Sequence, residues 1–173
     1  FTGSVSANQI KNLGAKYIIL GHSERRSSGD TNQIVNRKII SALSENLKVI
    51  LCIGETLDQK KKGLTEKIIL KQLSGCLKNI KNLKNIVFAY EPIWSIGTGK
   101  ILDYLELDNI INKIKNILKK KYKIKNSKVL YGGSVNSRNI LYIKKVKKIN
   151  GFLVGSASQN QNKFVDILKK SII

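Results

Sequence analysis

Methionine is absent from this 173-residue sequence, which contains one proline, one histidine, one tryptophan and two cysteines. Two cysteines make neither a disulfide framework nor a cysteine-based metal pattern, so we expect no bound metal. No apolar run approaches the roughly 20 residues needed to cross a bilayer, which favours a cytoplasmic protein. Because the chain begins with Phe1 rather than methionine, we expect it to be a piece of a longer protein.

Acidic residues are also scarce, since 11 of them face 32 basic residues and the formal net charge is +21 at pH 7. Such a charge would suggest binding to nucleic acid or to an anionic membrane. However, 28 of the basic residues are lysines that scatter along the whole chain, as solvated surface lysines do. No stacking-aromatic or recognition-helix motif is present. A nucleic-acid-binding module therefore rests on charge alone, and we expect neither nucleic acid nor a membrane as a partner.

The chain alternates short apolar runs with longer amphipathic stretches. We expect strands, buried on both faces, at residues 17–20, 49–53, 86–90, 129–131 and 152–154. Apolar residues at helical spacing predict helices at residues 30–46, 105–121, 137–146 and 161–172. This alternation predicts an α/β protein with a parallel sheet. Nothing in the composition marks a linker, so residues 1–173 are expected to form a single domain.

Nearly every predicted strand ends in a loop of glycines and polar residues. These loops are residues 21–26, 54–56, 91–92, 132–134 and 155–158. A (β/α)8 barrel gathers its chemistry at the carboxyl ends of its strands, whereas a doubly wound sheet concentrates ligand loops near one switch point. The pattern favours part of a barrel.

Two strand-end residues are candidates for proton chemistry. His22 follows the first predicted strand directly, and a histidine transfers protons or donates a hydrogen bond to a carbonyl near neutral pH. Glu91 follows the third strand and precedes Pro92, where a raised pKa would suit a general base. Taken alone, His22 is more often a strand cap and Glu91 more often half of an ion pair.

Glycine-rich loops are candidates for binding phosphate. Residues 95–100 (SIGTGK) follow Glu91 without the spacing of a nucleotide P-loop. They fit an anion cradle, a hinged lid or a plain connection. The glycines at 132–133 and Gly155 allow close approach of the backbone to a ligand, although tight turns need them equally. Loops after the last two strands of such barrels often hold phosphate.

Read in order, these motifs resemble the triosephosphate isomerase family. The similar segments are residues 1–3 (FTG), 21–26 (GHSERR), 52–56 (CIGET), 89–94 (AYEPIW), 96–100 (IGTGK), 131–135 (YGGSV) and 151–155 (GFLVG). The resemblance covers essentially the whole chain and implies a TIM barrel without its first three strands. It also implies interconversion of dihydroxyacetone phosphate and D-glyceraldehyde 3-phosphate, with no cofactor.

The resemblance implies a role for each matching residue. Glu91 would be the catalytic base and His22 a neutral electrophile. The remaining implied roles are support by Glu24 and Arg26, phosphate binding by Gly97, Ser134, Gly155 and Ser156, and lid contacts by Trp94 and Tyr131. Thr2, in the third-loop remnant, would enter the partner subunit of a homodimer.

Several departures from the family pattern accompany the match. Ser4 stands where the family usually has Glu, residues 101–102 are bulkier than the usual second lid hinge, and Ser156 replaces a common Gly. The family's first-strand Asn and Lys are missing, and the absence of three strands would leave open sheet edges and a half-exposed core. We therefore expect residues 1–173 alone to be neither stable nor active. The alternatives are another phosphate-binding barrel and a non-catalytic relic retained as a structural or binding protein.

Overall fold

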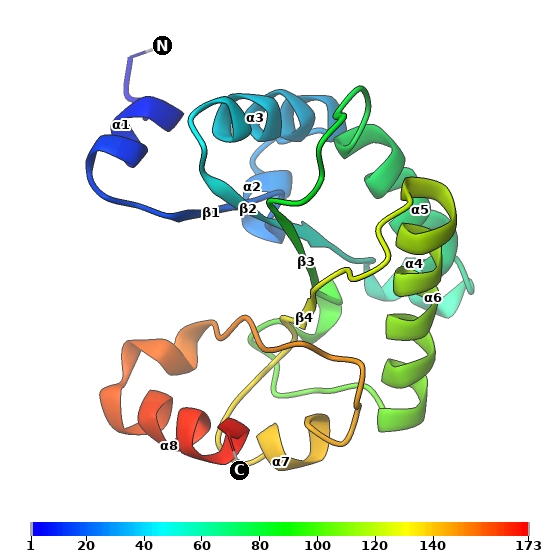
Figure 1. Ribbon diagram of the computed structural model, residues 1–173. Coiled ribbons are helices and arrows are strands. Elements are labelled where there is room, and N and C mark those ends of the chain that lie inside the picture. Colours follow the sequence, from blue (N-terminus) through cyan, green and yellow to red (C-terminus); the bar gives the residue numbers. More distant parts are fainter. Residues whose placement is uncertain (1, 173) are drawn as a thin grey trace.

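The computed structural model describes residues 2–172 and contains one four-stranded parallel sheet in the order β1-β2-β3-β4 (Figure 1). The strands are β1 (Tyr17–Leu20), β2 (Lys48–Ile53), β3 (Ile86–Tyr90) and β4 (Val129–Tyr131). Each strand pairs with the next one along the chain. The first four predicted strands are thus confirmed, and their carboxyl ends lie at the same edge of the sheet.

The helices are α1 (Ala7–Asn12), α2 (Ser23–Ser27), α3 (Asn32–Ser44), α4 (Leu57–Lys61), α5 (Thr65–Cys76), α6 (Tyr104–Tyr122), α7 (Ile140–Ile143) and α8 (Gln161–Ile172), with 3-10 turns η1 (Ile93–Ser95) and η2 (Ser156–Gln159). The long helices α3, α5 and α6 lie outside the curved sheet (Figure 1). None of the helices within residues 2–172 has the length and apolarity needed to cross a membrane.

The two longest helices begin at capped positions and bury one apolar stripe. Thr31 caps α3 by accepting a hydrogen bond from the Ile34 N–H, and Asp103 caps α6 in the same manner. α6 buries five residues at helical spacing, Leu107, Ile110, Ile111, Ile114 and Leu118. This stripe packs into the single core cluster that also contains the strand residues.

The predicted strand at residues 152–154 is wrong in part. Phe152 forms an isolated parallel bridge with Tyr131, and the Leu153 N–H donates to the Tyr131 carbonyl at 2.9 Å. The run has a sheet partner on one side only, so no longer ladder forms. The helix predicted at residues 137–146 shrinks to α7, whereas α3, α6 and α8 confirm the other three predicted helices.

The sheet is buried in its middle and open at its β1 edge. Val49, Leu51 and Phe88, on the central strands, are fully buried. On β1, by contrast, Tyr17 is 50% exposed and Ile19 is 47% exposed. β1 pairs with β2 alone among the described residues, so its other edge presents unpaired backbone groups.

Candidate active site

Glu91 lies at the carboxyl end of β3, and glycines of both neighbouring strand ends make room for it. Its N–H donates to the Ile53 carbonyl at 2.8 Å. A Cβ on Gly54 would stand 1.8 Å from the Glu91 carbonyl oxygen, and a Cβ on Gly132 would stand 2.7 Å from Glu91 Cγ. These two glycines therefore let the backbone and side chain of Glu91 pack against the strand ends.

The Glu91 carboxylate is buried, and one of its oxygens lacks a hydrogen-bond partner within the described part of the chain. The residue is 4% exposed, and burial raises the pKa of its carboxyl, although the neighbouring His22 acts in the opposite direction. Its Oε2 atom has no hydrogen-bond partner among residues 2–172. A buried, unpartnered carboxylate oxygen costs folding free energy, and it is available to accept a proton from a ligand.

His22 faces this carboxylate from the end of β1. It caps α2, and its Nδ1 accepts a hydrogen bond from the Glu24 N–H at 3.3 Å. Because Nδ1 is the acceptor, a neutral ring at this position would carry its proton on Nε2. Nε2 lies 3.5 Å from Glu91 Oε1. The structure thus brings together the two residues predicted to carry proton chemistry.

The two predicted supporting residues have different contacts: Glu24 lies near His22, and Arg26 binds the loop that carries His22. The exposed Glu24 carboxylate lies 3.9 Å from His22 Nδ1. Arg26 donates to the Gly21 carbonyl at 2.6 Å, to Asn32 Oδ1 at 2.7 Å and to the Cys52 carbonyl at 3.3 Å. Arg26 therefore ties the loop after β1 to the end of β2 and to the start of α3.

The glycine-rich segment 96–100 lies over the strand ends as a loop. Gly97 and Gly99 adopt φ angles of 71° and 76°, which favour glycine. The Gly99 N–H donates to Ser134 Oγ at 3.2 Å, and the Ser134 N–H donates to Ser95 Oγ at 3.2 Å. Tyr131 Oη lies 3.5 Å from Ser95 Oγ. The segment is thus attached to the loop after β4, as a closed lid would be.

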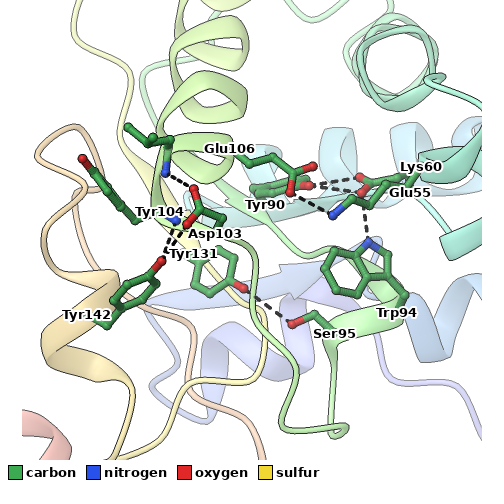
Figure 2. Close-up of polar contacts among 11 residues, drawn as sticks. Glu55, Lys60, Tyr90, Trp94, Ser95, Asp103, Tyr104, Glu106, Tyr131 and Tyr142 are labelled. Atoms are coloured by element: carbon green, nitrogen blue, oxygen red, sulfur yellow. Dashed lines mark hydrogen bonds and ion pairs between the residues drawn. The ribbon is translucent and has the colours of Figure 1, made fainter.

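The sequence reasoning missed a buried glutamate that follows β2 and contacts the residues just before this lid. Glu55 is fully buried and accepts hydrogen bonds from Tyr90 Oη at 3.2 Å and from Trp94 Nε1 at 3.1 Å (Figure 2). Lys60 lies over the Trp94 indole, 4.2 Å from the ring centroid, and pairs with Glu106 at 3.0 Å. The position of Glu55 beside Gly54 at a strand end was the available signal.

The other two predicted phosphate ligands, Gly155 and Ser156, do not contact Gly97 or Ser134 through hydrogen bonds in the described residues. Gly155 and Ser156 are exposed, and Ser156 begins η2 directly after the run that bridges to Tyr131. Neither residue forms a hydrogen bond with Gly97 or Ser134 in the described part of the chain. Within residues 2–172 no group of His, Cys, Asp and Glu side chains is arranged to hold a metal ion.

Comparison with known proteins decides the family. The family model described as triosephosphate isomerase matches residues 1–171. The chain belongs to the triosephosphate isomerase family. It is 45% identical over 172 residues to triosephosphate isomerase of Zygosaccharomyces bailii, an alignment that covers 97% of this chain and 69% of that protein. It is 41% identical over 174 residues to that of Alkaliphilus oremlandii, covering 97% of this chain and 70% of that protein.

Membership of the triosephosphate isomerase family explains the architecture. The parallel sheet with outer helices is part of a (β/α)8 barrel. The chain spans about 70% of the length of the relatives, in agreement with the prediction of a partial barrel. The expected family resemblance at residues 1–3 falls partly outside the described residues, because it includes Phe1. Thr2 and Ser4 are exposed.

Proposed function

We propose that the protein interconverts dihydroxyacetone phosphate and D-glyceraldehyde 3-phosphate. The observation that carries the proposal is the Glu91 carboxylate, buried and unpartnered at Oε2, with His22 Nε2 3.5 Å from its other oxygen. A base and a hydrogen-bond donor in this arrangement serve proton abstraction beside a carbonyl. The family of isomerases to which the chain belongs supplies the substrate class.

In the proposed reaction, Glu91 removes a proton from the hydroxymethyl carbon of dihydroxyacetone phosphate. The electron pair of that C–H bond moves toward the carbonyl oxygen and forms an enediolate. The Nε2–H of His22 hydrogen-bonds the enediolate oxygens and helps move the hydroxyl proton between them. Glu91 then returns its proton to the neighbouring carbon and yields the aldehyde. The raised pKa of Glu91 brings its proton affinity closer to that of the carbon acid.

The phosphate of the substrate is proposed to bind between the lid and the last two strand ends. Its ligands would be the N–H groups of Gly97, Gly155 and Ser156, together with Ser134. The contact between Gly99 and Ser134 supports this placement, because it brings the lid to the loop after β4. Trp94 and Tyr131 would hold the lid at its base. Exclusion of water by the lid strengthens electrostatic interactions within the site.

Assembly and location follow from family resemblance. A homodimer would use the remnant of the third loop around Thr2, and residues 2–6 are all exposed and free to contact another subunit. Light scattering of the full-length protein tests this assembly, and a monomer at micromolar concentration would contradict it. By the same resemblance we propose a cytoplasmic location.

The decisive test is isomerase activity of the full-length protein with glyceraldehyde 3-phosphate as substrate. Glu91→Asp moves the carboxylate back by about one methylene, so we expect kcat to fall by about 10²-fold. Glu66→Asp is the matched control, because it makes the same chemical change on the exposed face of α5. It should leave activity unchanged. A folded full-length protein without isomerase activity would favour the non-catalytic relic.

A further inference from the structure

The lid ends at a fixed point. Gly97, Gly99 and Lys100 are exposed, but Leu102, two residues further on, is 2% exposed and packs in the core cluster. Asp103 follows at once and caps α6, with its Oδ1 accepting the Leu105 N–H at 2.9 Å. The lid therefore passes from an exposed tip to a buried anchor within a few residues.

A tyrosine from another element completes this anchor. Tyr142 Oη donates to Asp103 Oδ2, the oxygen that the cap leaves free, at 3.0 Å. The same hydroxyl accepts the Tyr104 N–H at 3.0 Å, so both of its hydrogen-bonding functions are used on the start of α6 (Figure 2). The Tyr104 and Tyr142 rings meet edge to face with centroids 6.2 Å apart.

Tyr142 lies on α7, the helix that follows the loop after β4. Its neighbours Ile140 and Ile143 are buried and hold α7 in the core. Asn139, which precedes α7, donates from its side chain to the Ser134 carbonyl at 2.5 Å. The lid is thus tied to one segment at two points, at its tip through Ser134 and at its end through Tyr142.

We propose that Tyr142 is a positioning residue for the lid. This inference rests on the proposed isomerase function. The Tyr142 hydroxyl holds the lid end against α7, so that closure moves residues 96–101 alone and returns Gly99 to Ser134. Without that hydroxyl, Asp103 still caps α6 and the fold is kept, but the end of the lid is less restrained. The closed lid is then less populated, and the enediolate is exposed to water more often.

The experiment compares Tyr142→Phe with Tyr104→Phe in the full-length protein. Both variants keep an aromatic ring and lose one hydroxyl. Within residues 2–172 the Tyr104 hydroxyl has no hydrogen bond, whereas the Tyr142 hydroxyl has two. We expect Tyr142→Phe to lower kcat/KM by about tenfold, the effect of about one lost hydrogen bond. Tyr104→Phe should match the wild type.

A second readout separates positioning from general loosening. An enediolate that is not enclosed expels its phosphate: the C–O bond to phosphate breaks, inorganic phosphate leaves, and the remaining enol tautomerises to 2-oxopropanal. We expect the ratio of released phosphate to isomerised product to rise in Tyr142→Phe and to stay constant in Tyr104→Phe. Asp103→Ser keeps a capping oxygen but removes the acceptor for Tyr142. Asp103→Ser should raise the ratio as much as Tyr142→Phe does. The double variant Tyr142→Phe/Asp103→Ser should show no further rise, because both changes remove the same hydrogen bond.

Binding of glycerol 3-phosphate distinguishes failure of this inference from failure of the proposed function. Trp94 lies at the start of the lid, so the part of the full-length protein's fluorescence response that Trp94→Phe abolishes reports closure. A wild type that isomerises, with the two Phe variants alike in every readout, overturns the role of Tyr142. A wild type without isomerase activity, but with weaker glycerol 3-phosphate binding in Tyr142→Phe alone, supports that role and rejects the function. No fluorescence response and no activity reject both.

Discussion

Glu91 combines deep burial with an oxygen that no described side chain satisfies. Burial raises the pKa of its carboxyl, which means that the folded protein binds this proton more tightly than the unfolded chain does. Above the folded-state pKa the charged carboxylate therefore lowers the free energy of unfolding. Below the ordinary glutamate pKa of about 4.3 both states carry the proton and this cost is absent.

Glu91→Gln removes this charge while keeping the shape of the side chain. We expect the free energy of unfolding to rise by about 1 kcal/mol at pH 7, and the gain to disappear as the pH falls below about 4. Thermal unfolding of the full-length protein at both pH values measures this. Glu66→Gln, on the surface, serves as the control. A gain of equal size at both pH values would show that charge burial is not the cause. Isomerase activity should be lost in the same variant.

The proximity of His22 and Glu91 was predictable from sequence, because both residues directly follow apolar runs and parallel strands end at one edge of a sheet. Their proposed catalytic roles came from the family resemblance, since either residue alone more often has a structural role. Glu55 was not predictable in the same way. Its hydrogen bonds come from Tyr90 at a different strand end and from Trp94 in η1, and the spacing of residues around Glu55 does not predict these contacts.

Arg26 connects three elements, because its guanidinium donates hydrogen bonds to the loop after β1, to the end of β2 and to the start of α3. Arg26→Lys keeps the charge but loses the planar fork that serves several acceptors. We expect the free energy of unfolding to fall by about 2 kcal/mol, measured by urea denaturation of the full-length protein. Arg25→Lys is the matched control, because Arg25 is exposed and forms no hydrogen bond from its side chain to residues 2–172. Equal losses in the two variants would contradict a bracing role.

The prediction of helices and strands from sequence succeeded for helices with clear apolar periodicity. It failed where a strand depends on neighbouring strands. α3 and α6 have both apolar periodicity and a capping side chain, and their observed limits fall within two residues of the prediction. α5 was not predicted, although Ile69, Leu73 and Cys76 share a helical face, and its start has no capping side chain. The run at 152–154 has the composition of a strand, but a strand also needs neighbours, and Tyr131 alone supplies one.

At the scale of the whole molecule, the open edge of β1 is the main departure from a closed barrel. Tyr17 and Ile19 are about half exposed there, and the unpaired backbone groups of an edge strand favour association with other chains. The net charge of +21 adds repulsion within the chain. We expect both features to weaken the folded state of residues 1–173.

We expect residues 1–173 alone to show no measurable isomerase activity and to bind a hydrophobic dye. A chain extended at its amino end to the length of the relatives should be active and should not bind the dye. Activity assays and dye fluorescence on the two chains, at equal concentration, test this directly. Full activity of the shorter chain would mean that the described strands suffice to hold Glu91 and His22 in place.

The single histidine of the sequence lies in the candidate site, with Nδ1 bound to the Glu24 N–H and Nε2 facing Glu91. In a proton magnetic resonance spectrum of residues 1–173, every imidazole signal therefore comes from this one ring. The chemical shifts of its carbon-bound protons report on the surroundings of Glu91 without assignment or isotope enrichment. Within these residues the one histidine is thus a resonance probe for the candidate site.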